Sequence, residues 1–222
     1  MKAKNHVFIG AAWPYANGVL HLGHIAALLP ADILARYWRL KEKKVLFVSG
    51  SDCYGTPITV TAEKEGISPQ EVAEKYDQAF RRDLISRLGF SYDFYSRTTS
   101  KIHSQAAQEI FLDLLNKGLI YEKVQELPFC EGCQRFLPDR YIEGKCPDCG
   151  FENARGDQCD NCGHLLDAKD LLNPKCKLCL KEPKWKESTH FFFKLSAFQK
   201  QLQKWVKPQT HWRPNAYQFT LS

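Results

Sequence analysis

Eight of the nine cysteines in this 222-residue chain form four Cys-x-x-Cys pairs, and they constrain its fold more than any other feature. The pairs are Cys130/Cys133, Cys146/Cys149, Cys159/Cys162 and Cys176/Cys179. Between Pro128 and Pro183 the chain is rich in Cys, Gly, Pro, Asp and Lys and has little apolar periodicity, so hydrophobic burial alone cannot fold it. Two thiols at this spacing can face one tetrahedral zinc ion, and two pairs complete a site. The sequence predicts two structural zinc sites, and the spacing allows sequential or nested pairing.

The alternative for these cysteines is a disulfide framework, which requires an oxidising compartment. The first residues lead directly into an apolar strand and show no signal-peptide pattern. No apolar run reaches the roughly 18 residues of a membrane span. We therefore expect a cytoplasmic protein with reduced thiols and no membrane partner.

The net charge is a weak guide to partners. The formal charge is +6, which would suit a polyanion. Eight zinc-bound thiolates and two zinc ions would change it by about −4, leaving about +2. Hydrophobic residues make up 44% of the chain, a proportion typical of a globular protein.

A strand, a turn and a helix are expected near the N-terminus. Residues 6–12 form a short apolar run, Pro14, Asn17 and Gly18 interrupt it, and an apolar helical pattern follows over residues 25–38. This order delivers His21 and His24 to the start of a helix directly after a strand. In an open α/β sheet nucleotides bind there, because helix N-terminal N–H groups attract phosphate. Imidazoles at that place can donate hydrogen bonds to a reacting phosphoryl group.

The following residues extend this pattern into an α/β layer. Residues 44–49 predict a second, parallel strand that ends near Asp52, and Pro30 should kink the first helix or begin a new one. Residues 68–71 form a capping box for a helix that Gly89 stops. Another helix is expected at about 103–117, so we place the end of the α/β part there.

The motif Pro-Tyr-Ala-Asn-Gly-x-x-His-x-Gly-His at residues 14–24 resembles the signature of class I aminoacyl-tRNA synthetases, in the form of the methionyl-specific members. The resemblance implies a Rossmann-like nucleotide-binding fold, of which this chain carries the first half, with an inserted zinc-knuckle connective peptide. It implies the activity of a methionine–tRNA ligase, which activates methionine with ATP as methionyl-adenylate and transfers it to tRNA. Methionine, ATP with Mg²⁺, and the tRNA acceptor end are the implied partners.

The resemblance also assigns residue roles. His21 and His24 are the implied catalytic residues, and the implied ATP-binding residues are Pro14, Asn17, His21, Gly23 and His24. The implied methionine-binding residues are Ala12, Trp13, Tyr15 and Asp52. Asp52 would hold the ammonium group, although the same residue could serve only in a turn. The stretch 50–57 matches a second family segment, but Cys53 and Tyr54 stand where many members have an acidic residue and a histidine.

For the cysteines, the resemblance favours nested pairing. The inner zinc site would contain Cys146, Cys149, Cys159 and Cys162, and the outer site Cys130, Cys133, Cys176 and Cys179. Cys53 lies outside the pairs and is expected to be a buried, inert thiol.

The family's Lys-Met-Ser-Lys-Ser loop, which holds the ATP phosphates, has no counterpart here. We therefore expect residues 1–117 to be the first half of the catalytic domain. Residues 118–222 would be the connective peptide, with knuckles at about 128–183 and a truncated C-terminal end. Such a chain would be inactive without the missing C-terminal part. The alternatives are a leucine-, isoleucine- or valine-specific relative, and a non-catalytic zinc-knuckle module that binds RNA or protein.

Overall fold

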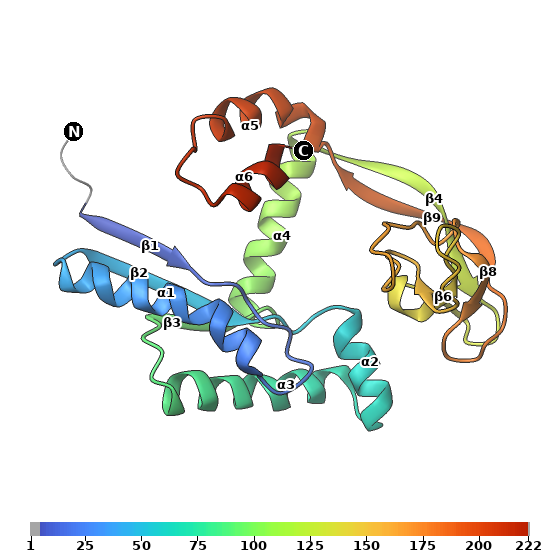
Figure 1. Cartoon of the computed structure of the whole chain (residues 1–222), viewed down its shortest axis with the longest axis horizontal. Coiled ribbons are helices and arrows are strands. Elements are labelled where there is room, and N and C mark those ends of the chain that lie inside the picture. Colours follow the sequence, from blue (N-terminus) through green and yellow to red (C-terminus); the bar gives the residue numbers. More distant parts are fainter. Residues whose placement is uncertain (1–4, 222) are drawn as a thin grey trace. The chain divides into compact units, whose positions relative to one another are not determined.

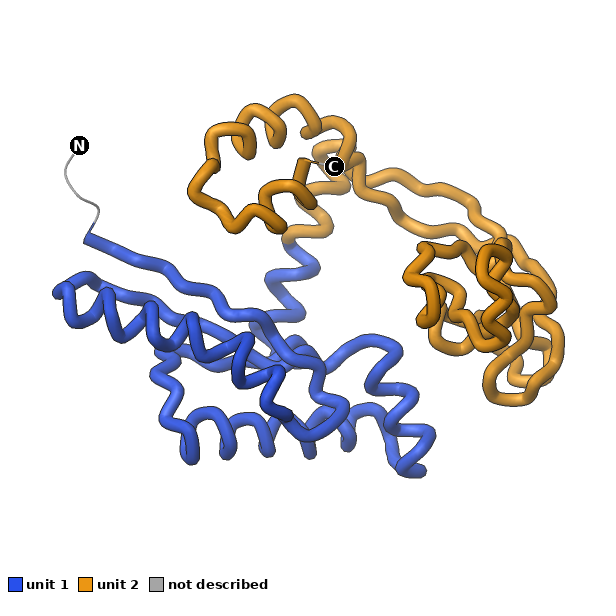
Figure 2. The backbone as a smooth tube through the Cα atoms, viewed as in Figure 1, with its two compact units in different colours: residues 1–109 blue, residues 110–222 orange. Residues whose placement is uncertain are grey.

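A computed structural model describes residues 5–221, and the chain divides into two compact units, residues 1–109 and 110–222 (Figure 2). The units meet within one helix, whereas the sequence placed the boundary after Lys117. That functional division remains a prediction.

Unit 1 is built on a parallel sheet of three strands in the order β1-β2-β3 (Figure 1). Its elements are β1 (His6–Gly10), α1 (Leu22–Leu40), β2 (Lys44–Ser51), α2 (Thr56–Glu65), α3 (Pro69–Phe80), η1 (Arg81–Arg87), β3 (Phe94–Arg97) and the first part of α4 (Lys101–Asn116). The predicted strand–helix–strand order is confirmed. Helix α1 runs through Pro30 as one element, so the prediction that a second helix could begin at Pro30 was wrong.

The core of unit 1 lies on one face of this sheet. Ile9 and Phe47 are paired across β1 and β2 and pack with Ala35 of α1, and Tyr95 of β3 packs into the cluster formed by α3. The connections from β1 to β2 and from β2 to β3 step across the sheet in the same direction. Right-handed crossovers of this kind place α1 and α3 on the same face. On the opposite face Phe8 is 69% exposed, so in this chain the sheet is packed from one side.

The helix predicted up to Gly89 has two parts. Ser68 and Glu71 form the expected capping box at the start of α3. Beyond Phe80 the turns widen to a π-helix, η1, and Gly89 ends the segment with φ +68°. Hydrophobic periodicity cannot distinguish this wider helix, because its inward residue Leu84 remains fully buried.

Unit 2 consists of two small antiparallel sheets and C-terminal helices (Figure 1). Its elements after α4 are β4 (Ile120–Cys130), β5 (Arg135–Phe136), η2 (Asp139–Tyr141), β6 (Ile142–Lys145), β7 (Ala154–Arg155), β8 (Leu172–Cys176), β9 (Lys184–Phe193), η3 (Leu195–Phe198), α5 (Gln199–Val206) and α6 (Pro214–Leu221). Strands β4 and β9 pair from Ile120↔Phe193 to Phe129↔Lys184, and this ladder brings the two ends of the cysteine-rich segment together. Among residues 5–221, no helix is long and apolar enough to cross a membrane.

Candidate functional site

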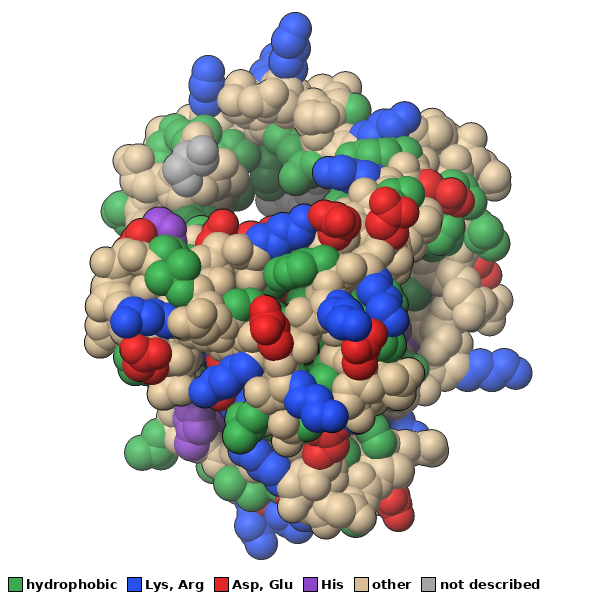
Figure 3. Space-filling view, turned by 90° about the vertical axis from the view of Figure 1, so that its right-hand side faces the viewer, with side chains coloured by type: hydrophobic (Ala, Val, Ile, Leu, Met, Phe, Trp, Pro, Cys, Tyr) green, Lys and Arg blue, Asp and Glu red, His purple; other side chains and the backbone are tan. Residues whose placement is uncertain are grey.

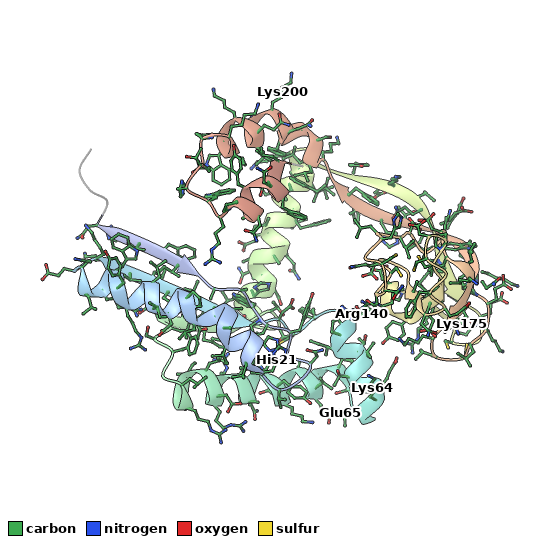
Figure 4. The ribbon with its side chains drawn as sticks, in the orientation of Figure 1. His21, Lys64, Glu65, Arg140, Lys175 and Lys200 are labelled. Carbon is green, nitrogen blue, oxygen red and sulfur yellow. The ribbon has the colours of Figure 1, made fainter. Side chains whose placement is uncertain are left out.

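His21 and His24 form the N-terminal cap of α1, after the turn that follows β1. Figure 4 labels His21 at this helix start. Nδ1 of His21 accepts a hydrogen bond from the Gly23 N–H at 3.1 Å, and Nδ1 of His24 accepts one from the His21 N–H at 3.2 Å. The two rings therefore take the places that Ser or Thr and Glu take in an ordinary capping box. The sequence placed both at the helix start but missed the box, although their three-residue separation was its signal.

These cap bonds determine which nitrogen of each ring faces outward. An Nδ1 that accepts a backbone hydrogen bond carries no proton, so each neutral ring has its proton on Nε2. Burial lowers the pKa of His24, and the electrostatic effect of the nearby His21 lowers it further. Both effects favour the neutral form of His24. The ring centroids are 3.9 Å apart. The helix start thus presents two N–H donors side by side, suited to an anion.

Gly23 is required by the His21 ring. A Cβ at Gly23 would lie 2.9 Å from Cε1 and 3.0 Å from Nδ1 of His21. Any side chain would push the imidazole out of its cap position.

The loop after β1 is tied to the end of β2. The Asp52 N–H donates to the carbonyl of Pro14 at 2.9 Å, and the Ala16 N–H donates to the carbonyl of Asp52 at 2.8 Å. Tyr15 and Asp52 pair as an isolated parallel bridge. Two of the residues predicted to bind methionine are therefore neighbours, at the carboxyl ends of adjacent strands. Asn17 lies in the same loop, where its carbonyl accepts a hydrogen bond from Thr61.

The Asp52 carboxylate is oriented by two donors. Its Oδ1 accepts from the Tyr54 N–H at 3.2 Å and from Thr98 Oγ1 at 3.5 Å. Thr98 Oγ1 in turn accepts from the Cys53 N–H at 2.8 Å. The turn role considered for Asp52 is therefore real, and it leaves Oδ2 for a ligand. Sequence reasoning missed Thr98, since no local pattern links positions 46 residues apart.

Trp13 lies against β2 and the start of α4. A Cβ at Gly50 would be 2.6 Å from the Trp13 ring and from the Ser96 carbonyl, so this ring needs glycine beneath it. The Trp13 and His103 rings are 5.8 Å apart. Ala12 accepts a hydrogen bond through its carbonyl from Ser49 at 3.2 Å. The loop is thus held through its backbone and the Trp13 ring, and the Tyr15 side chain is exposed.

A cavity of about 610 Å³ lies between the ends of β2 and β3 and the start of α3. Cys53, Tyr54 and Arg97 are among its lining residues, whereas the described residues predicted to bind methionine or ATP are not. Cys53 is buried, and burial raises the pKa of its thiol, as expected for an inert cysteine.

The eight paired cysteines form two clusters in unit 2, and the pairing is nested. One cluster contains Cys146, Cys149, Cys159 and Cys162, and the other Cys130, Cys133, Cys176 and Cys179, with all ligand atoms of a cluster within 4.8 Å of one another. The sulfur atoms are 3.3 Å apart in Cys130/Cys179 and 3.9 Å apart in Cys146/Cys162, close to the edge of about 3.8 Å expected for a ZnS₄ tetrahedron. The donor sets therefore suit zinc.

In the inner cluster the pKa of Cys149 is lowered, whereas hydrogen bonds with the neighbouring thiols contribute to raising that of Cys162. Asn161 Nδ2 lies 3.6 Å from Cys149 Sγ, and this contact, with a backbone N–H from Phe151, lowers the pKa of Cys149 to about 6. Asp148 and His164, one on each knuckle, pair at 2.7 Å. On the face shown in Figure 3, basic and acidic side chains are intermixed, so charge alone does not mark a nucleic-acid surface.

The model of a family described as tRNA synthetases class I (M) matches residues 7–222. A methionine–tRNA ligase of Dehalococcoides mccartyi is 57% identical over 216 residues, which cover 97% of this chain and 39% of that protein. One of Bacillus mycoides is 56% identical over 217 residues, 96% of this chain and 40% of that protein. The chain thus spans about 40% of the length of these curated relatives.

Two solved structures share the fold. Mycobacterium tuberculosis methionyl-tRNA synthetase in complex with methionyl-adenylate superposes with a TM-score of 0.64 at 22% identity, over 91% of this chain and 35% of that chain. A ternary complex of LeuRS, tRNA and LeuAMS from Agrobacterium radiobacter K84 superposes with a TM-score of 0.67 at 22% identity, over 96% of this chain and 24% of that chain.

Proposed function

Because the chain belongs to the family of class I tRNA synthetases, we propose that it is the N-terminal part of a methionine–tRNA ligase. Its substrates would be methionine, ATP and the acceptor end of tRNA. The observation that carries the proposal is the pair of histidine caps at the start of α1, reached by a loop after β1 whose Pro14 and Ala16 are hydrogen-bonded through the backbone to Asp52 at the end of β2.

In this proposal His21 and His24 are the catalytic residues. A methionine carboxylate oxygen attacks the α-phosphorus of ATP, the bond to the bridging oxygen breaks, and pyrophosphate leaves. The Nε2–H groups donate to phosphate oxygens as negative charge shifts toward pyrophosphate. Their cap bonds hold both rings in the donor tautomer before ATP arrives. Pro14, Asn17 and Gly23 shape the remainder of the ATP site, and Mg²⁺ would accompany the nucleotide.

Asp52 would accept the methionine ammonium group through Oδ2, while Thr98 and the Tyr54 N–H hold Oδ1. Ala12, Trp13 and Tyr15 would form the side-chain pocket, since aromatic rings make favourable contacts with a thioether sulfur. The exposure of Tyr15, 49%, leaves it accessible to a ligand.

The two cysteine clusters would each hold a structural zinc ion. Four thiolates leave no open coordination position, so the zinc ions stabilise the fold of the knuckles and take no part in the reaction. Residues 1–117 would form the first half of the catalytic domain and residues 118–222 the connective peptide inserted into it, in a cytoplasmic enzyme. A C-terminal part such as the relatives possess would supply the rest of the active site.

The test joins residues 1–222 to the remaining sequence of the Dehalococcoides mccartyi relative and measures methionine-dependent exchange of pyrophosphate into ATP. We expect exchange by the joined protein, and a rate below about 1 s⁻¹ for residues 1–222 alone. Asp52→Asn should raise the barrier by about 1.5–3 kcal/mol, as expected for a lost hydrogen bond to a charged group. A joined protein that folds but neither binds methionine nor catalyses exchange would favour the binding module.

A further inference from the structure

The two cysteine clusters differ in how far their sulfur ligands are covered. In the inner cluster Cys146 and Cys159 are buried, but Cys149 and Cys162 are exposed. The outer cluster, which contains Cys130, Cys133, Cys176 and Cys179, has no exposed member. Identical donor sets therefore face solvent to different degrees.

Local packing explains the difference. The inner knuckles end in Gly150 and Gly163, both with φ +74°, and a Cβ at Gly163 would meet no atom within 4 Å. In the outer cluster a Cβ at Gly132 would lie 3.0 Å from the Lys181 side chain and 3.1 Å from Cys179 Sγ. The Lys181 side chain thus packs closely against an outer knuckle. At the inner tips a Cβ at Gly150 would meet only Lys145 Cε, at 3.7 Å, and the tip at Gly163 is open.

We propose that the inner cluster is an oxidation site of this protein, where a peroxide reacts with Cys149 or Cys162 and releases the inner zinc ion while the outer site stays intact. This inference rests on the proposed zinc sites and is independent of the proposed catalysis. Reactivity of thiolates depends on access, and access is what separates the two clusters.

The reaction balances with hydrogen peroxide as the oxidant. The Cys149 thiolate attacks one peroxide oxygen, the O–O bond breaks, and hydroxide leaves and takes a proton to give water. The resulting sulfenic acid is attacked by a neighbouring thiolate; Cys159 Sγ lies 3.6 Å away. An S–S bond forms, a second hydroxide leaves as water, and two cysteines have lost two electrons to peroxide. With two ligands gone, the zinc ion is released.

The structural consequence is confined to the inner loop. Strands β6 and β7 share two residue pairs, Glu143↔Arg155 and Gly144↔Ala154, so little backbone pairing holds residues 146–162 once their metal is lost. Strands β4 and β9 keep their long ladder, and the outer cluster closes its end. Oxidation would loosen the knuckle tip and leave the remainder of unit 2 folded.

The experiment uses residues 1–222 loaded with zinc, whose content is first measured by elemental analysis. The protein is treated with increasing hydrogen peroxide in the presence of a colorimetric zinc chelator. Remaining thiols are then labelled with N-ethylmaleimide and each cysteine is assigned by peptide mass spectrometry. We expect release of about one zinc ion per chain, with oxidation at Cys149 or Cys162, before the outer cysteines react. Equal or earlier oxidation of the outer cysteines would overturn the proposal.

Two variants test the cause of the asymmetry. Lys181→Ala removes the cover from the outer knuckle, and Lys181→Met keeps its bulk without the charge. The first should bring outer-site oxidation closer to the inner rate, whereas the second should leave the order unchanged. Unchanged outer oxidation in Lys181→Ala would refute shielding as the cause. Elemental analysis below one zinc ion per chain would instead overturn the proposed zinc sites themselves.

Discussion

His21 has a structural role and a proposed catalytic role, and a pair of substitutions can separate them. In His21→Ala the Gly23 N–H loses its side-chain acceptor. The backbone N–H at position 21 is still present in this variant and can still donate to His24 Nδ1, so half of the capping box remains. In His21→Asn the side-chain oxygen can accept the same bond, since asparagine is among the preferred N-cap residues.

The size of each effect follows from these contacts. His21 is exposed, so its removal opens no cavity, and the expected loss is that of one N-cap, about 1 kcal/mol. For a chain of this size that corresponds to a decrease in melting temperature of about 2–4 °C. His21→Asn should recover most of this stability. Alanine has no donor, and the amide N–H of the shorter asparagine does not reach the position of Nε2–H, so both variants should lose about 10²–10³-fold in pyrophosphate exchange when joined to the remaining sequence of a relative.

The assays are urea or thermal unfolding followed by circular dichroism, and exchange at saturating methionine. A His21→Asn protein with normal stability and normal exchange would refute the donor role. A loss of about 3 kcal/mol in both variants would show that the ring is part of the core, and the interpretation of the helix start as a phosphate site would lose its main support.

Three further predictions concern metal, packing and pH. Chelation of the expected two zinc ions should unfold residues from about 128 to 183, seen by hydrogen exchange, while unit 1 keeps its protection; equal loss in both units would contradict metal-dependent folding of the knuckles alone. Gly50→Ala should destabilise unit 1 by about 1–3 kcal/mol in urea unfolding, because the new Cβ would meet the Ser96 carbonyl and the Trp13 ring at 2.6 Å, whereas Gly18→Ala, with open space around it, is the matched control. Because the pKa of His24 is lowered in the folded state, the unfolded chain binds a proton more readily. The contribution of His24 to stability is therefore present above about pH 6.5 and is lost as pH falls through the pKa of the folded state. His24→Gln retains an acceptor at that position and should flatten this dependence; an unchanged profile would show that His24 does not cause it.

Much of the local structure could be predicted from the sequence alone. The strand before the histidine motif, the helix after it and the capping box at Ser68 depend on residues within a few positions of one another. The same holds for the helix stop at Gly89, which has the positive φ that favours glycine. Short-range sterics and hydrogen bonds determine these features, and a sequence displays short-range spacing directly.

The tertiary structure decided what depends on distant pairing. Cys-x-x-Cys spacing could not choose between nested and sequential sites; the β4–β9 ladder brings Cys130 near Cys179 and makes the nested arrangement. Thr98 reaches Asp52 only because β3 lies beside β2 in the sheet. The difference in exposure between the two cysteine clusters depends on side chains that pack from elsewhere in the knuckles. Each of these contacts requires the register of strands far apart in the chain, and no local pattern of residues carries that register.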